Sequence, residues 1–319
     1  MASIPKSKHE REAKPAPPKE TFSLVSNEKL LAIYAAMVKC RMVQQRAAML
    51  FQQGKLASDL HASSGREAAA AAIAIDLQPG DLLSLSPGDW LPALVKGMAL
   101  ESLIRALAPA SPQLNGAASS SASEIVQNNI LPAVDKALGP STIRERAVAA
   151  QAAKQNSIVA AVLPSNEESL KPWHDILAAA ASRRLPIVFV HYADASKPPD
   201  RARSGRKSKN PNALFHGLPA IAVDALDAVA VYRVAYEAIV RARHGRGATL
   251  LECVTHAGIS SSGSAKEDEP TSNPLQRTDS ISTMETYLKS KGIEPAHHNQ
   301  QIVAAFNLEL DLATRFLGS

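Results

Sequence analysis

The sequence predicts an α/β protein in which helices cover both faces of a mostly parallel sheet. From residue 158 onward, short apolar runs alternate with amphipathic segments of helical spacing, a pattern typical of strands and helices in such a sheet. The runs are apolar almost throughout, as expected of strands buried on both faces. With 319 residues, 45% of them hydrophobic and 20% charged, the chain is long and apolar enough to bury a large core.

Three helices are predicted before this alternating region. Asn27 is suited to cap the first helix, whose apolar residues recur at helical spacing until Gly54 provides a natural stop. A second helix, rich in small residues, is predicted over 66–77. A third is predicted over Leu91–Leu107.

The alternating region contains four predicted strands. A helix over 141–155 leads into the first of them. The predicted strands are 158–163, 185–192, 220–224 and 249–254, and the helices between them are 167–182 and 227–243.

The remaining segments have the composition of tails and loops. Residues 1–25 are charged and proline-rich, which predicts a disordered basic tail. Residues 26–319 are predicted to form a single α/β domain. Flexible loops are expected near 108–124, which is low in complexity, and near 197–211, which is rich in lysine and arginine.

The composition argues against several classes of protein. The two cysteines, Cys40 and Cys253, lie in apolar patterns, so we expect buried thiols in a reducing compartment rather than a disulfide framework. No stretch approaches the ~20 apolar residues of a membrane span. The N-terminal segment lacks the apolar core of a signal peptide and contains glutamates. We therefore expect a cytoplasmic protein that does not contact a membrane.

Familiar catalytic motifs are absent from the sequence. No G-x-S-x-G, Walker or G-x-G-x-x-G motif follows a predicted strand. Cys253 and His256 lack a second pair at ligand spacing, so no metal site is predicted, and His297 and His298 are expected to be solvated. His61, placed between a loop and the alanine-rich helix, is a candidate for acid/base catalysis or ligand contact. A structural histidine bonded to its own loop is the alternative.

The basic loop near 197–211 has the charge to attract phosphate groups. It contains no interleaved aromatic residues on which bases would stack. A solvated loop therefore explains its composition, and nucleic acid is not an expected partner.

Several segments, taken in order, resemble one family. They include L-L-A-I-Y-A-A-M-V-K-C-R-M-V-Q-Q-R, D-L-H-A-S-S-G-R-E-A, L-Q-P-G-D, R-L-P-I-V-F-V, R-H-G-R-G-A-T-L-L-E-C-V-T and N-P-L-Q-R. Together they span most of residues 28–292. This ordered set resembles the alpha subunit of the decarboxylating component of 2-oxo acid dehydrogenase complexes, of the pyruvate and acetoin dehydrogenase type.

The resemblance implies a thiamine-diphosphate-binding, transketolase-like fold. It also implies a beta-type partner subunit in a heterotetramer, with thiamine diphosphate and Mg²⁺ at the interface and the alpha chain gripping the diphosphate and the metal. The implied activity is oxidative decarboxylation of a 2-oxo acid, or cleavage of acetoin, with acyl transfer to lipoamide. His61, Gly65 and Glu67 match the family's L-H-x-x-x-G-x-E-A motif, so His61 is the candidate catalytic residue.

Other contact points depart from the family. The tyrosine, arginine and histidine that grip the diphosphate are replaced by Pro87, Gly88 and Trp90, which removes a charge-assisted fork to phosphate. The family's glycine-aspartate-glycine turn, whose aspartate ligates Mg²⁺, is replaced by proline, serine and asparagine at 164–166. Proline removes a backbone donor, and a neutral hydroxyl replaces the anionic oxygen that Mg²⁺ prefers.

Further departures follow in the second half of the chain. The family's asparagine pair is replaced by Ala193 and Asp194, and Asp194 is the candidate cofactor-binding residue. The family's H-G-H-S segment falls on I-S-S-S at 259–262, and its glycine-rich segment has no counterpart in 108–124. These changes predict that the chain keeps the cofactor-binding fold but has lost the residues that bind the diphosphate and Mg²⁺.

Three hypotheses about function remain open. The first is a non-catalytic structural or regulatory subunit that associates with a beta-type partner or with itself. The second is a working enzyme subunit whose ligand groups come from other residues, with Asp194 and Asp89 as candidate carboxylates. The third is a binding module that uses the basic loop near 197–211 and the N-terminal tail.

Overall fold

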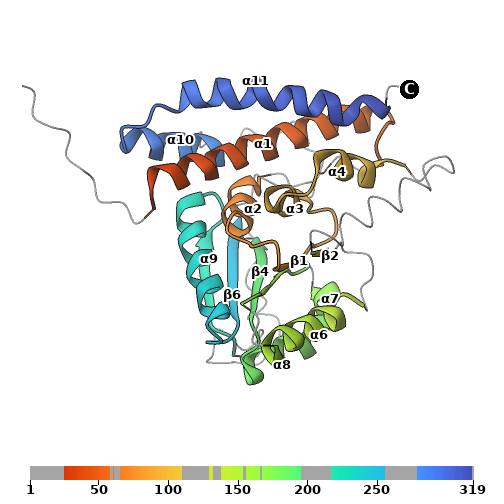
Figure 1. Ribbon diagram of the computed structural model, residues 1–319, viewed down its shortest axis with the longest axis vertical. Helices are drawn as coiled ribbons and strands as arrows, with labels where there is room; N and C mark the ends of the chain where they lie inside the picture. Colours follow the sequence, from red (N-terminus) through yellow and green to blue (C-terminus); the bar gives the residue numbers. More distant parts are fainter. Residues whose placement is uncertain are drawn as a thin grey trace, which may run out of the picture.

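The computed structural model describes residues 25–57, 60, 65–109, 129–131, 138–153, 156–165, 167–194, 217–255 and 279–317. Its strands form one six-stranded sheet in the order β2-β1-β3-β4-β6-β5, and every neighbouring pair is parallel (Figure 1). The strands are β1 (Leu82–Ser84), β2 (Ile130–Leu131), β3 (Val159–Val162), β4 (Ile187–Asp194), β5 (Ala220–Asp224) and β6 (Thr249–Thr255). The predicted parallel α/β fold is thus confirmed.

Both faces of the central strands are buried, as strand β4 illustrates, whereas the edge strand β5 is partly exposed. Ile187 and Phe189 point into a cluster with helices α6 and α8. Val188, Val190 and Tyr192 point into a second cluster with α1, α2, α9 and α10. Because each of these five side chains is at most 3% exposed, the strand has no polar face, and its sequence is apolar almost without interruption.

The helices form layers over these two faces and across one end of the sheet. Their bounds are α1 (Asn27–Gln52), α2 (Glu67–Ala74), α3 (Leu91–Lys96), α4 (Leu100–Leu107), α6 (Leu138–Ala152), α7 (Glu167–Leu170), α8 (His174–Arg183), α9 (Ala228–Arg243), α10 (Ser280–Ser290) and α11 (Pro295–Thr314). A third apolar cluster joins the second half of α1 to α3, α4 and α11. It contains Leu83 of β1 and Ala160 of β3, so it continues onto the sheet.

Helices α1 and α11 lie side by side and run in the same direction (Figure 1). Near their starts, the Tyr34 hydroxyl accepts a hydrogen bond from Asn299 at 2.9 Å and donates one to Glu285 at 2.6 Å. Near their ends, Arg46 pairs with Asp311 at 2.7 Å. The last two helices of the described chain are therefore integral to the fold.

The prediction of one helix over Leu91–Leu107 is wrong. The structure has two helices there, α3 and α4, separated at Gly97. Gly97 adopts φ +108°, a left-handed conformation that ends a helix and that glycine adopts without steric cost.

The prediction of one helix over 167–182 also needs correction. Helix α7 gives way to a 3₁₀ turn at Lys171–Trp173 before α8 begins. Pro172 lacks the backbone N–H that a continuous helix would need there. The neighbouring strand begins at Ile187 and reaches Asp194, two residues later at both ends than the predicted 185–192.

Four elements were not predicted. Strands β1 and β2 are three and two residues long, too short for a periodic signal. Helices α10 and α11 are interspersed with polar residues. His297 and His298 belong to α11, where His297 is exposed as expected and His298 is half-buried. In the described part of the chain, no helix is long and apolar enough to cross a membrane.

Candidate functional site

The chain reverses its direction across the sheet between β1 and β3. From β1 the path runs outward to β2, then returns through α6 to β3 on the opposite side of β1. In open parallel sheets, ligands bind beyond the carboxyl ends of the strands at such a switch point. The candidate site is therefore the carboxyl edge of the sheet around β1 and β3, together with the ends of β4 and β6.

A buried ion pair lies close to this edge. The Arg66 guanidinium, at the start of α2, lies 3.8 Å from the carboxylate of Asp89, which is fully buried in the loop after β1. The same guanidinium stacks over the ring of Tyr192 in β4, 4.2 Å from its centroid. Arg66 thus neutralises a carboxylate that would otherwise be costly to bury and makes a cation–π contact at the same time.

Tyr192 is enclosed within this cluster. Burial, and next the negative charge of Asp89, raise the pKa of its hydroxyl well above the usual value. Its hydroxyl oxygen is buried and has no hydrogen-bond partner among the described residues. At neutral pH Tyr192 therefore stays protonated and acts as a neutral aromatic surface for Arg66.

Glu67, which belongs to the segment matching L-H-x-x-x-G-x-E-A, forms an ion pair with a second arginine, Arg41. Glu67 is 1% exposed, and its Oε1 accepts a hydrogen bond of 2.6 Å from Arg41 Nε in α1. Arg41 also donates to Asp279, the residue that caps α10, at 2.6 Å. Burial alone would lower the pKa of Arg41, but the bonds to the two carboxylates outweigh it and the pKa is raised. Glu67 is thus positioned to fix α2 against α1.

The two thiols lie inside the protein, as predicted. Burial raises the pKa of Cys253 to about 12. Burial, followed by the charges of Glu67 and Asp89, raises the pKa of Cys40 as well. Because the thiolate is the reactive form, neither cysteine has the environment of a nucleophile or a metal ligand.

The residues singled out in the sequence are not equally well placed. His61 lies outside the described residues, so its role stays a prediction, and His256 lies outside them as well. Asp194 is the last residue of β4 and stands opposite Thr255 of β6, which puts its backbone at the carboxyl edge. Its role as a cofactor-binding residue stays a prediction as well.

The two altered turns do lie at this edge. Pro164 follows β3 and is buried, Ser165 is exposed, and Asn166 is outside the described residues. Trp90 is half-buried and packs against the third apolar cluster, while Gly88 has φ +77°. The segment 259–262, the loop 197–211 and all but the first two residues of 108–124 lie outside the described residues.

The fold and this edge define a class: open, all-parallel α/β proteins whose ligand site lies at a strand-order switch. A sequence model of the family described as "Dehydrogenase E1 component" matches residues 34–314. The chain belongs to this family.

Individual relatives are distant. The alpha subunit of acetoin:2,6-dichlorophenolindophenol oxidoreductase from Bacillus subtilis is 28% identical over 75% of this chain and 72% of its own length. The pyruvate dehydrogenase E1 component subunit alpha-3, chloroplastic, of rice is 26% identical over 76% of this chain and 60% of its own length. The pyruvate dehydrogenase E1 component subunit alpha of Acholeplasma laidlawii is 26% identical over 83% of this chain and 76% of its own length.

The family uses thiamine diphosphate and Mg²⁺, but the described residues at the switch point do not fit that group. Pro164 has no N–H to offer a phosphate, Ser165 is neutral, and the Asp89 carboxylate faces Arg66. Across the described ranges, no cluster of three or more histidine, cysteine, aspartate or glutamate residues is placed to hold a metal ion. The described residues at the switch point therefore form a packed edge of the sheet and do not supply the donors and acidic ligands of a magnesium-diphosphate site.

Of the three residues that meet at this edge, Arg66, Asp89 and Tyr192, the sequence pattern identifies only one. Asp89 is among the candidate carboxylates, whereas neither Arg66 nor Tyr192 stands out by pattern. Arg66 sits inside the matched G-x-E-A segment, beside Gly65, so its position is a usable signal. Its partners come from separate loops and strands, and no local pattern indicates that they meet.

Proposed function

We propose that this chain is an alpha-type subunit of the dehydrogenase E1 family that associates with a beta-type subunit and does not itself grip the diphosphate or the metal. In this role it acts as a structural or regulatory subunit. The second partner compatible with the fold is another copy of the same chain. The names of the relatives support the alpha-type assignment, because the three described above are alpha subunits.

The observation that carries the proposal is the chemistry of the β1/β3 switch point. A diphosphate and a dication need backbone or cationic donors for the phosphates and anionic oxygens for the metal. Here a buried proline follows β3, and the buried carboxylate after β1 lies 3.8 Å from an arginine of the same chain. The arginine that would hold phosphate in this family has no equivalent, since Gly88 stands at its position.

A working enzyme subunit is the second candidate. It is favoured by the presence of Asp89 and Asp194 at the carboxyl edge, where a metal ligand would have to lie. In that case Mg²⁺-dependent cofactor binding is lost in Asp194→Ala or Asp89→Asn. The activity would be thiamine-diphosphate-dependent oxidative decarboxylation of a 2-oxo acid or cleavage of acetoin.

The test is co-purification of the tagged full-length chain from its native host, with the protein partners and the thiamine diphosphate in the eluate quantified. We expect a beta-type subunit and far less than one cofactor per alpha chain. Near-stoichiometric cofactor that disappears in Asp194→Ala would refute the non-catalytic assignment. An eluate with neither a beta-type subunit nor a second copy would refute the subunit assignment and favour a binding role for the basic loop near 197–211.

Three broader expectations belong to the same proposal. Residues 26–319 form a single domain, with 1–25 as a basic tail. The protein is cytoplasmic. His61 is the candidate catalytic residue, and its replacement is silent if the chain is non-catalytic.

A further inference from the structure

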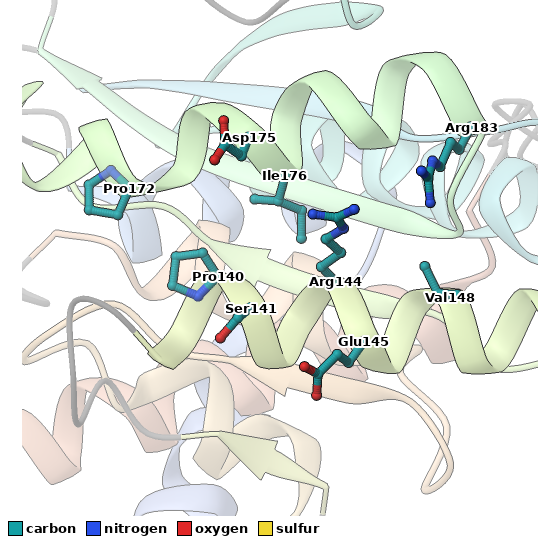
Figure 2. A pocket seen from close by; sticks show the side chains of 9 residues that line it. All are labelled: Pro140, Ser141, Arg144, Glu145, Val148, Pro172, Asp175, Ile176 and Arg183. Carbon is teal, nitrogen blue, oxygen red and sulfur yellow. The ribbon is translucent and has the colours of Figure 1, made fainter.

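A groove of about 510 Å³ runs between α6 and α8, on the helical layer that covers one face of the sheet (Figure 2). Pro140 and Pro172 lie toward one end of the groove, and Val148 and Ile176 contribute apolar side chains. None of its lining residues belongs to a strand end, so the groove is separate from the switch-point site. A ligand bound in this groove is therefore independent of the proposed function.

Two arginines share this groove. Arg144 comes from the middle of α6, and Arg183 is the last residue of α8. Figure 2 shows both guanidinium groups in the space between the two helices, while the carboxylate of Glu145 is turned away from α8. Asp175 also lines the groove, but it stands in the first turn of α8 and Arg183 stands at the opposite end.

Neither guanidinium is neutralised within the described part of the chain. Six other cationic side chains form ion pairs there, but Arg144 and Arg183 form none. Two like charges that face one concave surface repel each other, and an anion between them removes that repulsion. A guanidinium also offers a planar fork of donors that matches carboxylate and phosphate geometry.

The apolar side chains restrict the class of anion. Ile176 is 1% exposed and forms part of the groove's base, beside the partly buried Val148. We propose that the α6–α8 groove binds a small organic anion, whose phosphate or carboxylate group contacts Arg144 and Arg183 and whose apolar part contacts Val148. Dissolved salt screens charges in a partly enclosed site less than it screens charges in open solvent.

The experiment is isothermal titration calorimetry of the full-length chain at low ionic strength. Inorganic phosphate and butyrate are titrated separately into the wild type, Arg144→Gln and Arg183→Gln. Arg146→Gln is the matched control, because Arg146 is also an exposed arginine of α6 but does not line the groove. All four proteins are compared by circular dichroism, and surface arginines should be replaceable without loss of fold.

We expect saturable, one-site binding of at least one probe, weakened about tenfold by either groove variant and unchanged in Arg146→Gln. Tighter binding of phosphate identifies a phosphate-bearing ligand, whereas tighter binding of butyrate identifies a carboxylate with an apolar chain. The proposal is overturned if neither probe saturates. It is also overturned if Arg146→Gln weakens binding as much as the groove variants do.

Discussion

Replacement of Asp81 by asparagine should strongly destabilise the fold. Asp81 is fully buried before β1, and Arg243, the last residue of α9, is 9% exposed and donates to both carboxylate oxygens. The backbone N–H groups of Gln78 and Ile158 also donate to Asp81, at 2.7 and 2.9 Å. One side chain thus ties the start of β1 to α9 and to the residue before β3.

The expected loss is about 3–5 kcal/mol of unfolding free energy, because removing one partner leaves the other charge buried and uncompensated. At about 2–4 °C per kcal/mol for a protein of this size, the melting temperature should fall by roughly 10 °C. Urea denaturation followed by circular dichroism measures the change. Asp81→Asn combined with Arg243→Met removes both charges and keeps an amide oxygen that can accept from Gln78 or Ile158, so it should recover part of the loss.

The matched control is Asp311→Asn. Asp311 forms an ion pair with Arg46 of similar length, but its side chain is 61% exposed, so the change should cost about 0–1 kcal/mol. If Asp81→Asn cost no more than Asp311→Asn, burial would not determine the strength of these pairs, and the reasoning would be wrong.

Three further predictions concern the thiols, a helix end and a cap. Cys40 and Cys253 should resist a thiol reagent in the native protein and react after unfolding. Because burial raises the pKa of Cys253 to about 12, the free energy of unfolding should fall as the pH rises from about 8.5, where a thiol of the unfolded chain ionises. A free energy of unfolding that does not change with pH across that range would contradict this. Gly97→Ala should lower the free energy of unfolding in denaturant melts by about 1–2 kcal/mol, because Gly97 has φ +108°. The control, Gly80→Ala, should be near neutral, since a Cβ would meet open space at both positions. Equal costs would show that the backbone conformation is not the cause. Asp227→Ala should cost about 1 kcal/mol, since its side chain accepts bonds from the N–H groups of Val229 and Ala230 at the start of α9, and an unchanged melting curve would exclude that capping role.

The sequence determined the features that depend on local pattern. Strands β3, β4 and β6 are buried on both faces, so their sequences are apolar almost throughout. This composition alone indicates a parallel sheet under two helical layers. Asp227 and the following periodic residues predicted α9 to within one residue of its start. The replacement of an arginine by Gly88 and of an aspartate by Ser165 was visible in the sequence, because a missing donor or charge needs no tertiary structure to recognise.

Only the tertiary structure decided which residues meet. Arg66, Asp89 and Tyr192 are separated in the chain and converge because the starts and ends of parallel elements share one edge of the sheet. Helix α11 follows a polar stretch and owes its place to Phe306 and Leu310, which pack into a cluster shared with α1 and α4. Such contacts form between elements distant in sequence, where local propensity carries no information, and burial in the folded state supplies the energy that selects them.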